Sequence, residues 1–124
     1  TTTSREIISP HDHIKEDQIH VYDKRVVIEV DAQWARLKDT NSMDPLFDEG
    51  SNVLQIIPDE EKDVHIGDVV SYETEEGIII HRVIGIGRDK NGTFYIVKGD
   101  NNKDPDDIKV RFSDIKRVMI GVIY

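Results

Sequence analysis

Residues 77–98 constrain the fold more than any other part of the sequence. Residues 77–86 form a long run rich in isoleucine and valine, and residues 94–98 form a second strand-like run. Asn91-Gly92 lies between them, and this dipeptide favours the tight turn of a β-hairpin because both residues tolerate positive φ angles. The segment therefore predicts two antiparallel strands, which need further strands beside them to be stable.

Shorter runs of the same kind occur along the rest of the chain, separated by turn residues such as Gly, Pro and Asp. They lie at residues 25–30, 32–37, 52–57, 69–72 and 115–124. Few stretches have the spacing of apolar residues that is typical of an amphipathic helix. The pattern predicts an all-β domain, and a closed or half-closed barrel is the natural way to hide its edge strands.

The composition excludes several classes of function. The 124 residues fit one domain with its own core, and the absence of cysteine excludes disulfides, thiolate zinc sites and a cysteine nucleophile. A formal net charge of −9 argues against a nucleic-acid partner. No apolar run approaches the roughly 18 residues that span a bilayer.

A serine and a histidine are candidate catalytic residues. Ser42 lies in a turn-like segment between two expected strands, and His81 lies inside the apolar run of residues 77–86. Most serines in turns only satisfy backbone groups, and a histidine on a strand is often a core residue. A nucleophilic serine, however, needs a base within hydrogen-bond reach, and imidazole suits that role because its pKa is about 6.5.

An acidic loop follows these residues and offers the third group of a Ser/His/Asp site. A carboxylate fixes the tautomer of the histidine, and both Asp100 and Asp106 lie in the loop. The residues alone leave open which of them takes that part. Thr40 and the backbone N–H of Ser42 are candidate donors for an oxyanion hole.

The N-terminal histidines form a second group of potential ligands. A metal site needs a third fixed ligand, and none is evident beside His11, Asp12 and His13. We therefore interpret these residues as a solvated polar turn, and His20 and His65 as surface residues. No metal and no cofactor is expected.

Four short motifs occur in order between residues 42 and 106. They are Ser42-Met43-Asp44-Pro45, Ile66-Gly67-Asp68-Val69-Val70, Ile80-His81-Arg82-Val83, and Lys98-Gly99-Asp100-Asn101-Asn102 with Pro105-Asp106. Together they closely resemble the type I signal peptidase family, in its archaeal and endoplasmic-reticulum branch. That branch has histidine where the main bacterial branch and the related LexA-type repressors have lysine. The resemblance runs from about Val26 to the end of the chain.

The resemblance implies a coiled β-barrel of the LexA/signal-peptidase kind and a serine endopeptidase that removes signal peptides from secretory precursors after small residues. Ser42 matches the nucleophile and His81 the general base. Asp100 and Asp106 both match important acids, with Asp106 slightly favoured as the partner of His81. Thr40 falls where related enzymes place an oxyanion-hole hydroxyl. Gly50-Ser51 departs from the Gly-Asp that family members usually carry.

The resemblance also implies how the domain is organised and where it acts. Residues 1–24 are expected to be a lead-in segment and residues 25–124 the catalytic domain. Family members carry a membrane helix before this domain, so an anchor is expected upstream of Thr1, with the domain on the extracytoplasmic side. This chain itself is expected to be soluble. The expected partners are precursors with signal peptides, and the need for accessory subunits is open.

Two alternatives use the same fold. One is a non-enzymatic or inactive binding module. The other is a LexA-like self-processing regulator, which predicts a lysine base and an internal Ala-Gly or Cys-Gly scissile bond. The sequence has His81 in place of the lysine and contains neither dipeptide.

Overall fold

The computed structural model describes residues 6–38 and 41–124, and the predicted all-β class is confirmed. The strands are β1 (Ile19–Val21), β2 (Val26–Ile28), β3 (Gln33–Arg36), β4 (Asn52–Ile56), β5 (Val69–Thr74), β6 (Gly77–Asp89), β7 (Gly92–Lys98), β8 (Val110–Arg111) and β9 (Ile115–Ile123). Short 3-10 helices lie at η1 (Glu16–Gln18), η2 (Glu61–Asp63) and η3 (Phe112–Asp114). Within the described ranges no helix is long and apolar enough to cross a membrane.

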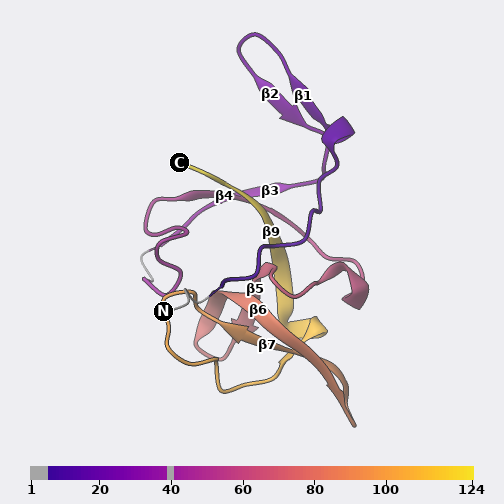
Figure 1. The fold of residues 1–124 in the computed structure, drawn as a ribbon, viewed down its shortest axis with the longest axis vertical. Helices are drawn as coiled ribbons and strands as arrows, with labels where there is room; N and C mark the ends of the chain where they lie inside the picture. Colours follow the sequence, from indigo (N-terminus) through magenta and orange to yellow (C-terminus); the bar gives the residue numbers. More distant parts are fainter. Residues whose placement is uncertain (1–5, 39–40) are drawn as a thin grey trace, which may run out of the picture.

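Seven strands form one antiparallel sheet in the order β3-β4-β9-β5-β6-β7-β8 (Figure 1). The hairpin predicted at Asn91-Gly92 joins β6 to β7, with Asp89 opposite Gly92. No closed barrel is found, because β3 and β8 do not pair with each other in the part of the chain that is described. These edge strands have only 4 and 2 residues, so they leave few unpaired backbone groups without closure.

The sheet bends at three register shifts, and its curvature encloses the core. The shifts lie at Leu54/Gln55, Ser71/Tyr72 and Val83/Gly85, and such bulges increase strand bending. One core cluster contains Val64, Val70, Tyr72, Val83, Tyr95, Val97, Val110, Ile115 and Val118. The other contains Met43, Phe47, Val53, Val69 and Met119. The second cluster includes two residues of the loop that carries Ser42, so packing of the core fixes this loop.

A hairpin of β1 and β2 projects from the rest of the molecule (Figure 1). The expected boundary between residues 24 and 25 falls in the turn of this hairpin. Its apolar side chains are largely open to solvent, with Val21 75% and Val26 61% exposed.

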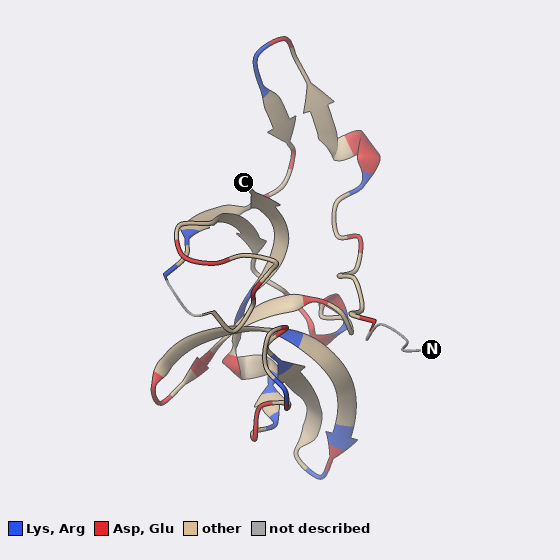
Figure 2. Cartoon of the chain, turned by 60° about the vertical axis from the view of Figure 1, so that its left-hand side comes forward, with Lys and Arg blue, Asp and Glu red and all other residues tan. Residues whose placement is uncertain are grey.

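Trp34 on the edge strand β3 is also exposed and donates its indole N–H to Asn52. The described acidic residues gather at turns and loops, as Figure 2 shows for the hairpin tips.

Arg82 on β6 holds three segments together. Its Nη1 donates to the carbonyl oxygens of Ile8 and Gly67, each at 2.9 Å. Its Nε and Nη2 donate to the two carboxylate oxygens of Asp100 at 2.9 and 2.8 Å. Arg82 and Asp100 are both buried at the side chain, so the pair is held in a low-dielectric setting. The described N-terminal segment is therefore tied to β6 at Ile8.

The substitution Arg82→Met is expected to lower the free energy of unfolding by about 3–5 kcal/mol, because it leaves the buried carboxylate of Asp100 without its partner. Urea denaturation measures this loss. Lys62→Met is the matched control, since Lys62 pairs with Glu60 at an exposed site, and it should change stability by no more than about 0.5 kcal/mol. Equal effects of the two substitutions would contradict the structural role of Arg82.

Candidate active site

Ser42 lies in the loop between β3 and β4, and its position is set by contacts on both sides. Met43, the next residue, is fully buried in the core. The carbonyl oxygen of Ser42 accepts a hydrogen bond from the backbone N–H of Asn101 at 2.9 Å. The backbone N–H of Asp100 points at the Met43 sulfur, 3.4 Å away. The position of Ser42 is therefore fixed by hydrogen bonding to the acidic loop after β7 and by the burial of Met43 in the core.

Two backbone positions make this close approach feasible. A Cβ atom at Gly99 would lie 2.7 Å from the Ser42 carbonyl oxygen and 2.6 Å from Nδ2 of Asn102, so only glycine fits there. Asn41, just before Ser42, has a positive φ of 55°, which asparagine tolerates better than most residues. Its carbonyl oxygen accepts a hydrogen bond from the Asn101 side chain. Asn41 therefore suits the position just before the serine.

His81 brings the serine and an acid together. It lies on β6 opposite Val70 of β5 and is only 6% exposed. Its Nε2 lies 3.2 Å from Oγ of Ser42, and its Nδ1 lies 2.7 Å from Oδ2 of Asp106. Both distances are within hydrogen-bond reach. Ser42, His81 and Asp106 therefore form a continuous hydrogen-bonded chain.

The partners of His81 determine its tautomer. An ionised carboxylate only accepts hydrogen bonds, so Nδ1 carries the proton that faces Asp106. In the neutral imidazole, Nε2 then has a lone pair that faces the hydroxyl of Ser42. This is the arrangement in which an imidazole can accept the serine proton and give it up again.

Asp100 does not contact His81. Both of its carboxylate oxygens are bound by Arg82, and its side chain is buried with that arginine. Asp106 instead enters from the later part of the same loop, where its backbone N–H donates to the carbonyl of Val97. The two aspartates that the sequence left as alternatives therefore have different partners, and only Asp106 is placed to orient His81.

Tyr72 is a member of the site that sequence reasoning missed. Its hydroxyl donates to Oδ2 of Asp106, the same oxygen that faces His81. Burial raises the pKa of Tyr72 well above its usual value, and the hydrogen bond to Asp106 and the charge of that residue raise it further. The signal that could have found it is strand register: pairing of Thr74 with Gly77 sets Tyr72 opposite Ile79, two residues from His81.

A groove of about 640 Å³ opens beside Ser42 and His81. Its remaining lining residues are Arg36, Leu37, Lys38, Phe47, Ile78, Ile79, Ile80 and Asn102. A neighbouring groove of about 520 Å³ shares Leu37, Ile78 and Ile80 with it and continues along β3 to Trp34. The serine and the histidine thus lie in a cleft with mostly apolar walls, which suits a peptide with apolar side chains.

One edge of β6 is available beside the site. Residues 77–82 of β6 pair with β5, but the pairing with β7 begins only at Arg82. Among the described strands none covers the other edge of residues 77–81. An extended peptide can add to such an edge through backbone hydrogen bonds, and it would then run past His81.

The candidate oxyanion-hole residues are placed only in part. Thr40 lies outside the described residues. Ser42 lies within them, and its backbone N–H as an oxyanion donor stays a prediction. The geometry that carries chemistry is therefore the chain of Ser42, His81 and Asp106 together with the adjoining groove.

Of the N-terminal residues that we interpreted as a solvated turn, His11 and Asp12 are exposed but His13 is not. His13 is largely buried, and its Nε2 lies 3.0 Å from both carboxylate oxygens of Asp68. His11 stacks on the half-exposed ring of His65 with 3.8 Å between ring centroids. The interpretation of His13 as solvated was wrong because its partner, Asp68, is distant in sequence.

Comparisons with protein-family models, with curated proteins and with solved structures found no match for this chain. The functional assignment therefore depends on the residues and their geometry.

The raised pKa of Tyr72 predicts a specific alkaline loss of stability. The folded state holds the phenol proton more tightly than the unfolded state, so this stabilising contribution is complete below the usual tyrosine pKa of 10.0 and declines as the pH rises further. Urea midpoints should therefore fall more steeply for wild type than for Tyr72→Phe between about pH 10 and pH 11.5. Identical slopes in the two proteins would contradict the raised pKa of Tyr72.

Proposed function

We propose that this protein is a serine endopeptidase of the signal-peptidase type. The observation that carries the proposal is the unbroken contact from Ser42 Oγ to His81 Nε2 at 3.2 Å and from His81 Nδ1 to Asp106 at 2.7 Å. A hydroxyl, a base with a free lone pair and a carboxylate behind it are the groups that acyl transfer by serine requires. The resemblance of the four sequence motifs to signal peptidases supports the same reaction.

The proposed reaction has two steps. Oγ of Ser42 attacks the carbonyl carbon of the peptide bond while Nε2 of His81 takes the hydroxyl proton, and Asp106 stabilises the imidazolium that forms. His81 then gives this proton to the leaving amine, which leaves an ester on Ser42. Water, deprotonated by His81, attacks the ester and releases the new carboxyl end, and Ser42 recovers its proton. Thr40 and the N–H of Ser42 are the proposed donors to the oxyanion in both steps.

The groove supports an extended peptide as substrate. The open edge of residues 77–81 offers backbone hydrogen-bonding groups, and apolar side chains such as Leu37 and Ile80 line the cleft beside the serine. Both features suit the extended region of a signal peptide around its cleavage site. The preference for small residues before the scissile bond follows from the resemblance alone.

Membrane attachment is part of the proposal, because signal peptides are delivered in a bilayer. We propose that the full-length protein carries an anchor and that the domain lies on the extracytoplasmic side. This rests on the resemblance alone. Cell fractionation of the full-length protein tests this directly. Recovery of the protein in the fraction free of membranes would contradict it.

The experiment that tests the proposal is cleavage of a synthetic secretory-precursor peptide in detergent micelles, with alanine before the scissile bond. Wild type should cleave it, and Ser42→Ala should lose at least about 1,000-fold in kcat because the nucleophile is gone. Ser113→Ala is the matched control, since Ser113 is an exposed serine in η3, and it should retain wild-type activity.

Two outcomes would contradict the proposal. Equal cleavage by wild type and Ser42→Ala would assign the activity to another protein in the sample. No cleavage by any of the proteins, even with the bilayer anchor restored, would favour the inactive binding module.

The two aspartates should respond differently to the same change. Asp106→Asn should lower kcat by about 10,000-fold with little loss of stability, because it removes the carboxylate that fixes the tautomer of His81. Asp100→Asn should lower the free energy of unfolding by about 3 kcal/mol, since it breaks the pair with Arg82. Its kcat, measured well below the unfolding temperature, should stay within about tenfold of wild type. The roles assigned to the two residues would be contradicted if Asp100→Asn lost kcat and Asp106→Asn lost stability instead.

A further inference from the structure

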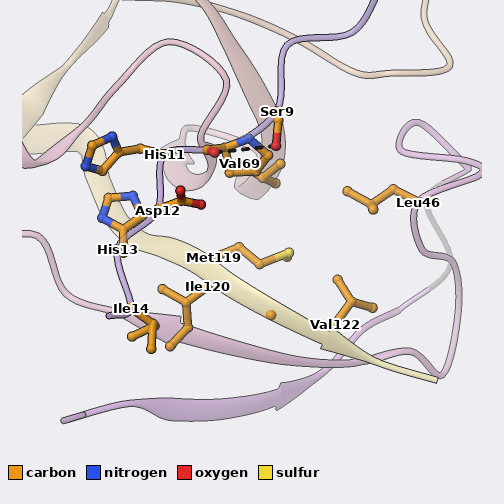
Figure 3. Close-up of a pocket in the computed structure, with 12 residues that line it drawn as sticks. Ser9, His11, Asp12, His13, Ile14, Leu46, Val69, Met119, Ile120 and Val122 are labelled. Carbon is orange, nitrogen blue, oxygen red and sulfur yellow. Dashed lines mark hydrogen bonds between the residues drawn. The ribbon is translucent and has the colours of Figure 1, made fainter. Parts of the chain in front are cut away.

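A cluster of metal-ligating side chains lies away from the candidate active site. His13 Nε2, His65 Nδ1 and a carboxylate oxygen of Asp68 all lie within 4.8 Å of one another. His13 comes from the N-terminal segment, whereas His65 and Asp68 come from the connection between β4 and β5. Figure 3 shows the His11 and His13 rings side by side where the N-terminal segment crosses β9.

Asp68 is the fixed member of this cluster. It is fully buried, and its carboxylate accepts hydrogen bonds from the backbone N–H groups of His11 and His65 at 3.0 and 2.9 Å. These contacts aim the carboxylate at the two imidazoles. A buried carboxylate that faces histidine nitrogens is a common arrangement in zinc sites.

His65 supplies an observation that hydrogen bonding does not explain. Its Nδ1 is shielded from solvent and has no hydrogen-bond partner among the described residues. The nearest carboxylate oxygen, Oδ2 of Asp68, is 3.7 Å away, which is too long for a hydrogen bond. A buried ring nitrogen without a partner is costly, and a bound cation would satisfy it.

The spacing between Asp68 and each histidine nitrogen is close to that of a zinc site, and the two histidine nitrogens lie within 4.8 Å of each other. Zn–N and Zn–O bonds of about 2.0–2.2 Å in a tetrahedron place neighbouring ligand atoms about 3.3–3.5 Å apart. The separations from Asp68 are 3.0 Å to His13 Nε2 and 3.7 Å to His65 Nδ1, so shifts of a few tenths of an ångström bring both into range. Two imidazole nitrogens and one carboxylate oxygen are ligands that zinc accepts readily, whereas magnesium prefers oxygen alone.

His11 holds two of the ligands in place without contributing one itself. Its backbone N–H binds Asp68, and its ring lies parallel to that of His65, with an interplanar angle of 7°. The rings are therefore oriented before any cation binds, which lowers the cost of assembling the site.

We propose that His13, His65 and Asp68 bind one Zn²⁺, with water as the fourth ligand. The ion joins the N-terminal segment to the connection before β5, across 55 residues of sequence. Its role is structural, since it pins this segment where Ile8 already accepts a hydrogen bond from Arg82. The sequence predicted no metal because the third ligand, Asp68, is far from the two histidines first considered.

The test is calorimetric titration of the EDTA-treated, desalted protein with zinc chloride. One equivalent should bind, and Tm should rise by about 5 °C or more at a free zinc concentration about 100 times Kd. Magnesium chloride should do neither. These readouts do not depend on peptidase activity, so the outcome is independent of the proposed function.

Matched variants separate ligand loss from misfolding. His13→Gln keeps a donor for Asp68 and His65→Phe keeps the stacking on His11, but each removes a zinc ligand and should weaken zinc binding at least about 100-fold. His20→Ala, in the projecting hairpin, should bind like wild type. Circular dichroism without zinc establishes that each variant folds. Undisturbed binding by folded His13→Gln and His65→Phe, or no binding by wild type, would overturn the proposal.

Discussion

The arrangement of the site depends on two neighbouring residues of β6 whose side chains point to opposite faces of the strand. His81 faces Ser42 and Asp106, whereas Arg82 faces the other side of the strand and binds Asp100, Ile8 and Gly67. Because successive side chains of a strand point to opposite faces, one strand carries the candidate base on one side and the main anchor of the surrounding loops on the other. The contacts of Arg82 therefore fix the loops that surround the candidate base, His81.

The acidic loop after β7 links these two faces. Asp100 is held by Arg82, which fixes the start of the loop, and the next residue, Asn101, binds the Ser42 carbonyl oxygen through its backbone N–H. Further along the loop, Asp106 reaches His81 and accepts the hydroxyl of Tyr72. A single connection thus positions the nucleophile and orients the base. Preorganisation of this kind avoids reorganisation during the reaction.

Local pattern was sufficient to predict most strands and the main hairpin, because β-branched runs and Asn91-Gly92 act over short distances. β2 lies within the predicted run of residues 25–30, but β1, its pairing with β2 and the two-residue strand β8 were missed, since runs of two or three residues have no distinctive pattern. Local pattern left open whether the barrel is closed or half-closed, because closure depends on pairing between strands that are distant in the sequence.

The candidate site was predicted to a similar degree. Ser42 and His81 were identified from residue type and order, but the choice between Asp100 and Asp106 depended on which one Arg82 binds, and this is a tertiary contact. Tyr72 was missed, because its place beside His81 depends on the register between β5 and β6. His13 and Asp68 are 55 residues apart in the sequence, so the local sequence around either residue does not predict their contact.

The most direct test of the central claim is mass spectrometry of Ser42 during turnover of an ester substrate with the same acyl group as the precursor peptide. Esters acylate a serine faster than amides do, so the acyl-enzyme should accumulate and be caught by an acid quench. The account predicts an added acyl mass on the fragment that contains Ser42, and none in His81→Ala. Ester turnover by wild type without any adduct on Ser42, or with an adduct on another residue, would contradict it.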